Sequence, residues 1–170
     1  NLDAWNVGRR DNFDYLMAGL SDLPAIAVTH TPDHARRGGY YGTRILYDSA
    51  KLVGISRGAL LKALRAEGVT VDIERYPLLH LTPYYRQRQR AYDGYLAPVV
   101  RSDYDDVPYE PGDFPGTEAF HEQLLALPVF TAPQFALLDQ IIEAFHKVMA
   151  GTNVEDLKDA EERGDPVLFD

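Results

Sequence analysis

The segment from residue 56 to 74 constrains the fold most, because it joins a capped helix to a half-exposed strand through one glycine. Ser56 is a residue type that caps helix N-termini, and three leucines between 60 and 64 form a helical stripe. Gly68 stands where a helix ends on a left-handed residue. Apolar and polar residues then alternate from 69 to 74, which predicts a strand with one wet face. The segment therefore indicates an α/β fold class.

Two other segments show the helical spacing of apolar residues. The first runs from residue 3 to 20. The second continues to residue 150 and begins at Thr131, whose hydroxyl we expect to form a capping box with Gln134. Its predicted buried face consists of Phe135, Leu138, Ile141, Ile142, Phe145 and Met149.

Two short runs rich in β-branched or aromatic residues predict further strands, at 25–29 and 40–47, that pair as neighbours. A chain of 170 residues with 45% hydrophobic content is long enough to bury one sizeable core. We therefore expect a small, mainly antiparallel sheet that is covered by the helices at 56–67 and 131–150.

Residues 77–116 hold most of the prolines and many of the tyrosines but show little periodicity. We expect a long, mostly irregular excursion there, followed by a helix from Thr117 through Leu124. Charged residues dominate the end of the chain, which favours a solvated segment. The predicted organisation is one domain at 1–150 and a charged tail at 151–170.

The composition disfavours several classes of protein. A net charge of -9 repels phosphate backbones, so we expect no nucleic-acid binding despite the arginines at 86, 88 and 90. No stretch approaches the ~20 apolar residues that cross a bilayer, and the first residues lack the pattern of an export signal. With no cysteine in the chain, disulfides and thiolate sites are excluded. We expect a soluble, cytoplasmic protein with no membrane partner.

Two polar stretches are candidates for chemistry. His30 and His34 lie four residues apart with Asp33 between them, which is a metal-ligand spacing on a helix. Pro32 disfavours a helix there, so we expect a turn and no metal, although a metal-dependent hydrolase stays a third hypothesis. The stretch at 36–42, RRGGYYG, is similar to an anion cradle but leads into a strand, and we favour a mobile loop.

Read in order, the chain resembles the C-terminal part of the DegT/StrS family of sugar aminotransferases, which depend on pyridoxal phosphate (PLP). The resemblance begins with RRDNFDYLMAGLSDLP, similar to the linking helix of the family. It continues with GISRGALLKALRAEGVTVDIERYPLLHLTPYY, and it closes with FPGTEAFHEQLLALPVF and a final helix. It covers roughly residues 5 to 150. The helix at 1–20 is then the linking helix and residues 1–150 the small domain of a fold-type I aminotransferase.

The resemblance implies transfer of an amino group from glutamine or glutamate to a keto-sugar or keto-cyclitol. In such enzymes a larger N-terminal domain carries the PLP lysine and most of the phosphate cup. Lysines 51, 62, 147 and 158 of this chain all lack the desolvated setting that a Schiff-base lysine needs. We therefore expect no catalytic residue here, no activity without the large domain, and a homodimer that binds PLP mainly through that domain.

The resemblance also places substrate contacts in the small domain. Arg75 and Tyr76 fall where relatives commonly carry a His-Tyr pair, so this chain departs from the pattern by an arginine. The arginine offers a planar fork for hydroxyl, carboxylate or phosphate oxygens. Six residues form the predicted substrate-binding set, although packing is an equal explanation for each tyrosine: Arg75, Tyr76, His80, Tyr84, Tyr40 and Tyr41.

A second hypothesis stays open beside the aminotransferase. The chain can instead be a free-standing, non-catalytic small domain that binds another chain or a sugar. A sequence that opens inside a helical pattern and lacks an initiator methionine favours a piece of a longer enzyme. A coding frame extending upstream of Asn1 is expected only for the enzyme.

Overall fold

The computed structural model describes residues 1–28, 31–35, 37, 41–52, 55–86, 90–91, 95–96 and 109–150. The chain divides into two compact units. The first unit comprises Asn1–Ile73 and Gln123–Asp170, and the second comprises Glu74–Glu122.

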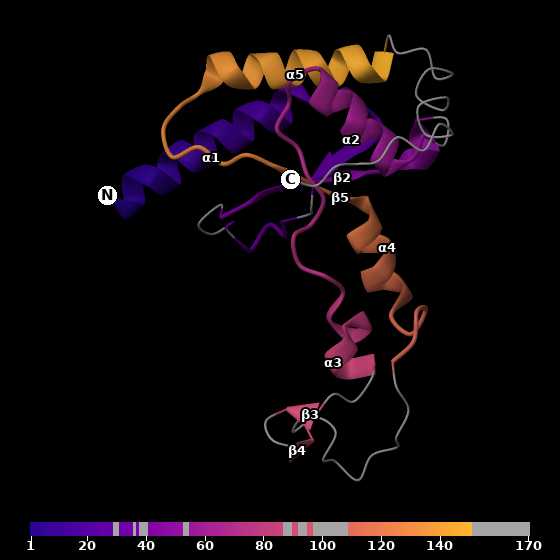
Figure 1. The fold of residues 1–170 in the computed structure, drawn as a ribbon. Coiled ribbons are helices and arrows are strands. Elements are labelled where there is room, and N and C mark those ends of the chain that lie inside the picture. The colour runs from indigo at the N-terminus through magenta and orange to yellow at the C-terminus, as the bar shows by residue number, and fades with distance from the viewer. Residues whose placement is uncertain are drawn as a thin grey trace. The chain divides into compact units, whose positions relative to one another are not determined.

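The first unit contains three long helices: α1 (Leu2–Gly19), α2 (Arg57–Ala66) and α5 (Phe135–Ala150). The predicted caps of α2 are confirmed. The Ser56 Oγ accepts a hydrogen bond of 3.1 Å from the backbone N–H of Ala59, and Gly68 has a φ of 87°. A short 3-10 helix at Ser49–Lys51 follows the second strand. Figure 1 shows α1 and α5 side by side, with α2 next to α5.

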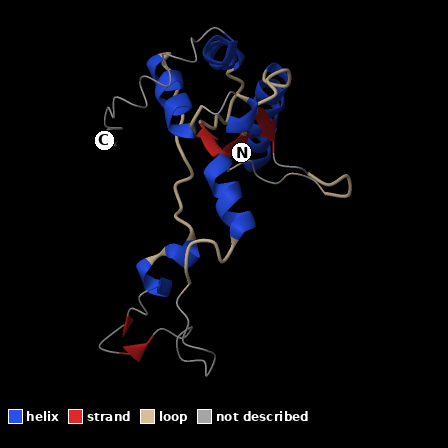
Figure 2. Ribbon diagram, turned by 90° about the vertical axis from the view of Figure 1, so that its right-hand side faces the viewer, coloured by secondary structure: helices blue, strands red, loops and turns tan. Residues whose placement is uncertain are grey.

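The sheet of the first unit has three antiparallel strands in the order β1 (Ile26–Val28), β2 (Thr43–Tyr47) and β5 (Leu124–Leu127). The predicted pairing of the first two strands is confirmed, with Ile26 opposite Tyr47. The strands are red and the helices blue in Figure 2. An antiparallel sheet with a helical cover is the fold that the sequence predicts.

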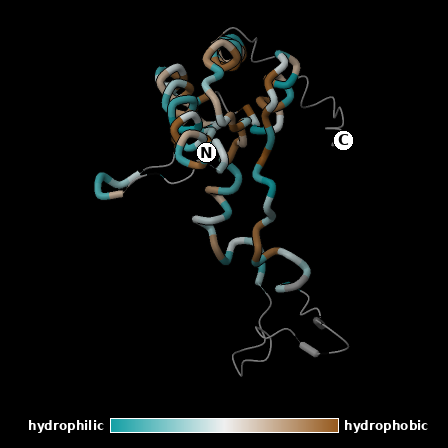
Figure 3. Tube along the Cα trace, turned by 90° about the vertical axis from the view of Figure 1, so that its left-hand side faces the viewer, coloured by the Kyte–Doolittle hydropathy of each residue, from teal (hydrophilic) through white to brown (hydrophobic). Residues whose placement is uncertain are grey.

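The core lies on one face of the sheet. Alternate residues of β2 are buried, and Ile45 and Tyr47 pack in one cluster with side chains of all three helices. Brown, apolar positions recur along these helices and strands in Figure 3. The predicted face of α5 is confirmed at Leu138, Ile141 and Phe145. The prediction that Phe135 belongs to this buried face is wrong. Its side chain is 42% exposed and contacts the Tyr15 ring at the surface, with 4.8 Å between ring centroids.

The strand predicted at 69–74 does not form. The alternation is correct, since Val69 and Val71 are buried, but the chain makes only an isolated bridge between Asp72 and Ala126. Nearby side chains form hydrogen bonds with the backbone groups that a longer β-strand would use for pairing. The carbonyl of Val71 accepts from Arg65 Nε at 3.0 Å, and the Asp72 carboxylate accepts from the N–H of Ile73 at 2.8 Å.

The helix predicted from Thr117 through Leu124 has different ends. Helix α4 spans Pro115–Gln123, and Leu124 instead begins β5. Three leucines of β5 are buried, and β2 supplies an open ladder edge, with Thr43 opposite Leu127. Long-range pairing therefore decides the conformation of this apolar run, which local spacing does not distinguish from a helix.

The capping box predicted at Thr131 is also wrong. Helix α5 begins at Phe135, and Thr131 is exposed. The backbone N–H of Gln134 donates to Oδ1 of Asn12 on α1 at 2.9 Å. Because this side chain satisfies the turn before α5, the helix needs no threonine cap.

The second unit contains short elements. They are a 3-10 turn η2 (Leu79–Leu81), helix α3 (Pro83–Arg86), an antiparallel pair β3 (Arg90–Ala91) and β4 (Tyr95–Leu96), and α4 up to Glu122. This matches the irregular excursion that the sequence predicts. The predicted tail at 151–170 lies outside the described residues. Across the part of the chain that is described, no helix has the length and apolar character needed to cross a membrane.

Candidate functional site

The second unit holds a hydrogen bond between His80 and Glu118. His80 lies in η2, and its Nε2 is 2.9 Å from Oε1 of Glu118 in the first turns of α4. The two side chains are only 10% and 21% exposed. The pair therefore joins two chain segments that are 38 residues apart, in an environment with little water.

The Glu118 carboxylate also accepts backbone hydrogen bonds from the turn before α4. The N–H of Gly112 lies 3.0 and 2.9 Å from its two oxygens, and the N–H of Phe114 lies 3.3 Å from Oε1. Residues 110–113 form a turn with Pro111 second and Gly112 third, and Gly112 has a φ of 98°. This is the residue pattern of a type II turn, whose third position favours glycine. The turn thus directs its amides at the carboxylate.

These contacts keep Glu118 ionised. The hydrogen bond from His80 lowers the pKa of the Glu118 carboxyl, and the N–H groups of Gly112 and Phe114 lower it further. Partial burial opposes them by raising the pKa, but the net shift is downward. At neutral pH the group is a carboxylate that only accepts hydrogen bonds.

A row of rings continues from His80. The His80 ring meets the ring of Phe114 edge-on, with 4.8 Å between centroids. Phe114 lies 5.6 Å from Tyr109, which lies 6.3 Å from Tyr85. Such tilted contacts are favourable arrangements of aromatic rings. They give the second unit a small aromatic cluster around the His80–Glu118 hydrogen bond.

Besides its contact with His80 in η2, helix α4 contacts the segment that precedes η2. His121 Nε2 lies 3.1 Å from the backbone carbonyl oxygen of Tyr76. His121 is three residues from Glu118, so both project from the same side of the helix. The segment itself is exposed, with 59% of Tyr76 in solvent and the Arg75 guanidinium carbon 6.0 Å from the Tyr76 ring centroid.

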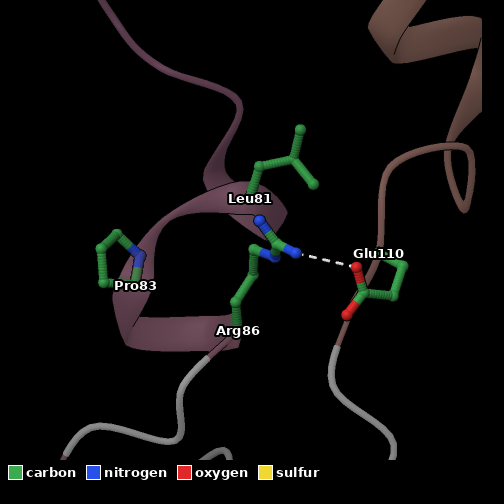
Figure 4. A pocket seen from close by; sticks show the side chains of 4 residues that line it. All are labelled: Leu81, Pro83, Arg86 and Glu110. Carbon is green, nitrogen blue, oxygen red and sulfur yellow. Dashed lines mark hydrogen bonds and ion pairs between the residues drawn. The ribbon is translucent and has the colours of Figure 1, made fainter.

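A hollow of about 240 Å³ lies beside this cluster and is lined by Leu81, Pro83, Arg86 and Glu110. Figure 4 shows the Arg86 guanidinium pointing at the Glu110 carboxylate, with 2.8 Å between Nη2 and Oε2. Both side chains are largely exposed, so the pair itself contributes little to stability. The lining therefore combines one ion pair with the apolar side chains of Leu81 and Pro83.

The sequence profile of the DegT/DnrJ/EryC1/StrS aminotransferase family matches residues 1–101, which is more than half of the chain. The chain belongs to this family. Its enzymes are PLP-dependent sugar aminotransferases. The resemblance found in the sequence is therefore confirmed.

Individual relatives of the family show the same similarity. A protein of Streptoalloteichus tenebrarius named as an L-glutamine:3-amino-2,3-dideoxy-scyllo-inosose aminotransferase is 27% identical over 162 residues, covering 93% of this chain and 34% of that protein. DesV of S. venezuelae, solved with a ketimine intermediate, matches with a TM-score of 0.63 and 22% identity over 89% of this chain and 33% of DesV. NtdA of Bacillus subtilis, solved with the cofactor PMP, has a TM-score of 0.58 and 19% identity over 85% of this chain and 28% of NtdA.

The chain spans about a third of the length of these relatives. The structural similarity confirms the fold class, because solved enzymes with matching folds, an aminotransferase of Streptoalloteichus hindustanus among them, have the fold of fold-type I aminotransferases. This chain corresponds to the matched third of the family fold.

Lys51 and Lys147 do not fit the family's PLP site. Lys51 and Lys147 have side chains that are 57% and 64% exposed, and they pair with Asp48 and Glu67. Lys62 is half-buried on α2. A lysine that forms a Schiff base needs desolvation to keep its amine neutral, and the exposed positions of Lys51 and Lys147 do not provide it. Lys158 lies outside the described residues. Among the residues that are described, no group of histidines and carboxylates can hold a metal ion.

The structure describes five of the six predicted substrate residues, one of them, Tyr84, without its side chain. Arg75 and Tyr76 are exposed neighbours in the second unit, and His80 is nearly buried and engaged with Glu118. Tyr84 lies in α3, but its side chain is outside the described part of the structure. Tyr41 belongs to the first unit and is 80% exposed.

Tyr40 lies outside the described residues, as does His30 of the metal hypothesis. Sequence reasoning missed Glu118 and Glu110, and it gave His121 no functional role. A signal was present at 111–118, where a Pro-Gly pair is followed by Pro115 and an acidic residue in the first turns of the helix. Acidic residues are favoured there because of the helix dipole.

Proposed function

We propose that this chain is the C-terminal small domain of a PLP-dependent enzyme that transfers an amino group from glutamine or glutamate to a keto-sugar or keto-cyclitol. The observation that carries the proposal is the family match over residues 1–101, and the similarity to a scyllo-inosose aminotransferase supports a cyclitol or sugar acceptor. We further propose that the enzyme acts in the cytoplasm as a homodimer.

The small domain acts only with a large domain that holds PLP. The exposed, ion-paired positions of Lys51 and Lys147 support this division of labour. Exposed apolar side chains on the first turns of α1 support it as well, since Leu2, Trp5 and Val7 are 63%, 48% and 44% exposed. Apolar surface of this kind is typical of interfaces, and the large domain is the partner we assign to it.

The small domain lends side chains to the substrate pocket. Arg75 and Tyr76 lead this set because both are exposed and adjacent, and because the Glu74 carboxylate accepts from their backbone N–H groups at 2.9 and 3.4 Å. The exposed guanidinium of Arg75 can present a planar fork to oxygen atoms of the acceptor. His80, Tyr84, Tyr40 and Tyr41 complete the proposed set.

The experiment separates the two half-reactions in the full-length enzyme. Arg75→Ala should lower kcat/KM for the acceptor by about one to two orders of magnitude, because a charge-assisted hydrogen bond is lost. The half-reaction with the amino donor should change less. Lys51→Ala, which removes an exposed cation of the first unit, is the matched control. Normal acceptor kinetics in Arg75→Ala, Tyr76→Phe and His80→Ala with intact folding would contradict the proposed pocket.

A separate measurement tests the division between domains. The 170-residue chain mixed with PLP should show no absorbance band that disappears when one lysine is mutated. A stoichiometric, lysine-dependent band would contradict the assignment of cofactor binding to the large domain.

A further inference from the structure

Glu118 determines which ring nitrogen of His80 carries the hydrogen. An ionised carboxylate has no hydrogen to donate, so the 2.9 Å contact requires that His80 Nε2 carry the hydrogen. In the neutral ring, the other nitrogen, Nδ1, is then an acceptor. The tautomer of His80 thus follows from its partner.

The carboxylate is itself held in place. Its two oxygens accept from the N–H of Gly112, and Oε1 accepts also from the N–H of Phe114. The Phe114 ring then meets the His80 ring edge-on at 4.8 Å. Because the acceptor and the ring wall belong to one turn and helix start, the imidazole has little freedom to rotate or to flip.

The other ring nitrogen of His80, Nδ1, is the one whose hydrogen-bond partner must be identified. Among the residues that the structure describes, Nδ1 of His80 makes no hydrogen bond, whereas Nε2 is fully engaged. Helix α4 also fixes the chain just before η2, through the 3.1 Å contact between His121 and the carbonyl of Tyr76. The segment that carries Arg75 and Tyr76 is therefore held by the same helix that orients His80.

We propose that Glu118 is a positioning residue that holds His80 as the Nε2–H tautomer, so that Nδ1 accepts a hydrogen bond from a hydroxyl group of the sugar or cyclitol substrate. The proposal rests on the proposed function, because it names the substrate group that this segment binds. A polyol is the matching ligand class, since its hydroxyls are donors. A ligand with acceptor oxygens alone gains nothing from an unprotonated ring nitrogen.

The first measurement does not depend on activity. In the full-length enzyme labelled with ¹⁵N-histidine, a His80→Gln variant assigns the His80 signals. We expect the shifts of an Nε2–H tautomer in the parent enzyme and in Glu118→Gln, whose amide oxygen still accepts a hydrogen bond. Glu118→Ala should show a mixture of tautomers. An Nδ1–H tautomer in the parent enzyme would overturn the proposal.

The second measurement is kinetic. Glu118→Ala should raise KM for the acceptor about 3- to 10-fold, with kcat and the donor half-reaction little changed, because one neutral hydrogen bond is weakened. Glu118→Gln should restore most of the affinity. In a His80→Ala background the Glu118→Ala change should have no further effect on acceptor KM, since the residue acts through the imidazole. Glu143→Ala on α5 is the matched control, because Glu143 is exposed there.

The outcomes distinguish a failure of the positioning role of Glu118 from a failure of the proposed function. An equal rise in KM for Glu118→Ala with and without His80 means a structural role and overturns the proposal. If Glu118→Ala does not fold, the tautomer in the parent enzyme and in Glu118→Gln still decides. Absence of aminotransfer in the parent enzyme contradicts the proposed function alone, because the tautomer remains measurable.

Discussion

The side chain of Asn12 on α1 accepts a hydrogen bond from the backbone N–H of Gln134, which is 122 residues away, at 2.9 Å. The same amide donates to the carbonyls of Phe130 and Ala132, at 3.0 and 2.8 Å. Asn12 is only 4% exposed. One buried side chain therefore satisfies three backbone groups of the turn that leads into α5.

Replacing Asn12 by alanine should lower the free energy of unfolding by about 1–3 kcal/mol, because partly buried backbone groups lose their partners. Denaturant unfolding of both proteins measures the difference. Asn6→Ala is the control, since the side chain of Asn6 accepts a hydrogen bond from Arg9 on the same helix, and its effect should stay within about 0.5 kcal/mol. Equal losses for the two variants would show that the bridge to α5 adds nothing.

Gly8 allows the backbone of α1 to approach the same turn. A Cβ at this position would lie 2.3 Å from the carbonyl oxygen of Thr131, so Gly8→Ala forces the backbone to shift. We expect a lower melting temperature. Gly58→Ala on α2 is the control, where the nearest atom is Ser56 Oγ at 3.7 Å. That change should stabilise the protein by up to about 1 kcal/mol through helix propensity. A melting temperature raised by both substitutions would argue against close packing of α1 and the turn.

Ile141 is a central residue of the core. It is 5% exposed and packs in the cluster that joins α5 to the sheet. Ile141→Ala should cost about 2–5 kcal/mol of unfolding free energy, from lost burial and the cavity that remains. Gln140→Ala, at an exposed position of the same helix, should be nearly neutral. A loss well under 1 kcal/mol at Ile141 would mean that this face does not form the core.

The stabilising effect of Glu118 should disappear in acid. Its pKa is lowered in the folded protein, so its contribution is complete above the unfolded value near 4.5 and is lost as the pH falls through the folded value. Glu118→Gln removes this dependence, and the stability difference between parent and variant should shrink below pH 4.5. Urea unfolding at pH 7 and at pH 3 measures it. The exposed Glu143 serves again as the control.

Local sequence signals predicted the parts of the fold that depend on neighbouring residues. The cap at Ser56, the glycine at 68 and the spacing of α5 all act within a few positions, and each is confirmed. The errors lie where a distant residue decides. Asn12 determines the turn before α5, and β2 recruits Leu124–Leu127 into a strand. No pattern within ten residues of either site contains that information.

The site was predictable to a smaller extent. Resemblance to the family pointed to Arg75, Tyr76 and His80, but a family pattern does not state which residues face one another. The pairing of His80 with Glu118 depends on a turn that brings together residues 38 positions apart. Its only local sign was an acidic residue in the early turns of α4, where the helix dipole favours negative charge.

The contact between Tyr15 and Asp139 should produce an alkaline dependence of stability. The Tyr15 hydroxyl donates to Asp139 Oδ1 at 2.6 Å, which joins the surfaces of α1 and α5. This hydrogen bond is the main cause that raises the pKa of Tyr15 above its ordinary value of 10, and the nearby negative charge adds to it. A raised pKa in the folded state means that stabilisation is complete below pH 10 and is lost as the pH rises through the folded value. Tyr15→Phe should therefore be less stable than the parent at pH 8, and the difference should diminish above pH 10. Melting temperatures at both pH values measure this, with Tyr76→Phe as a control for general effects of tyrosine ionisation. A difference that stays constant across the range would show that the hydrogen bond does not form in solution.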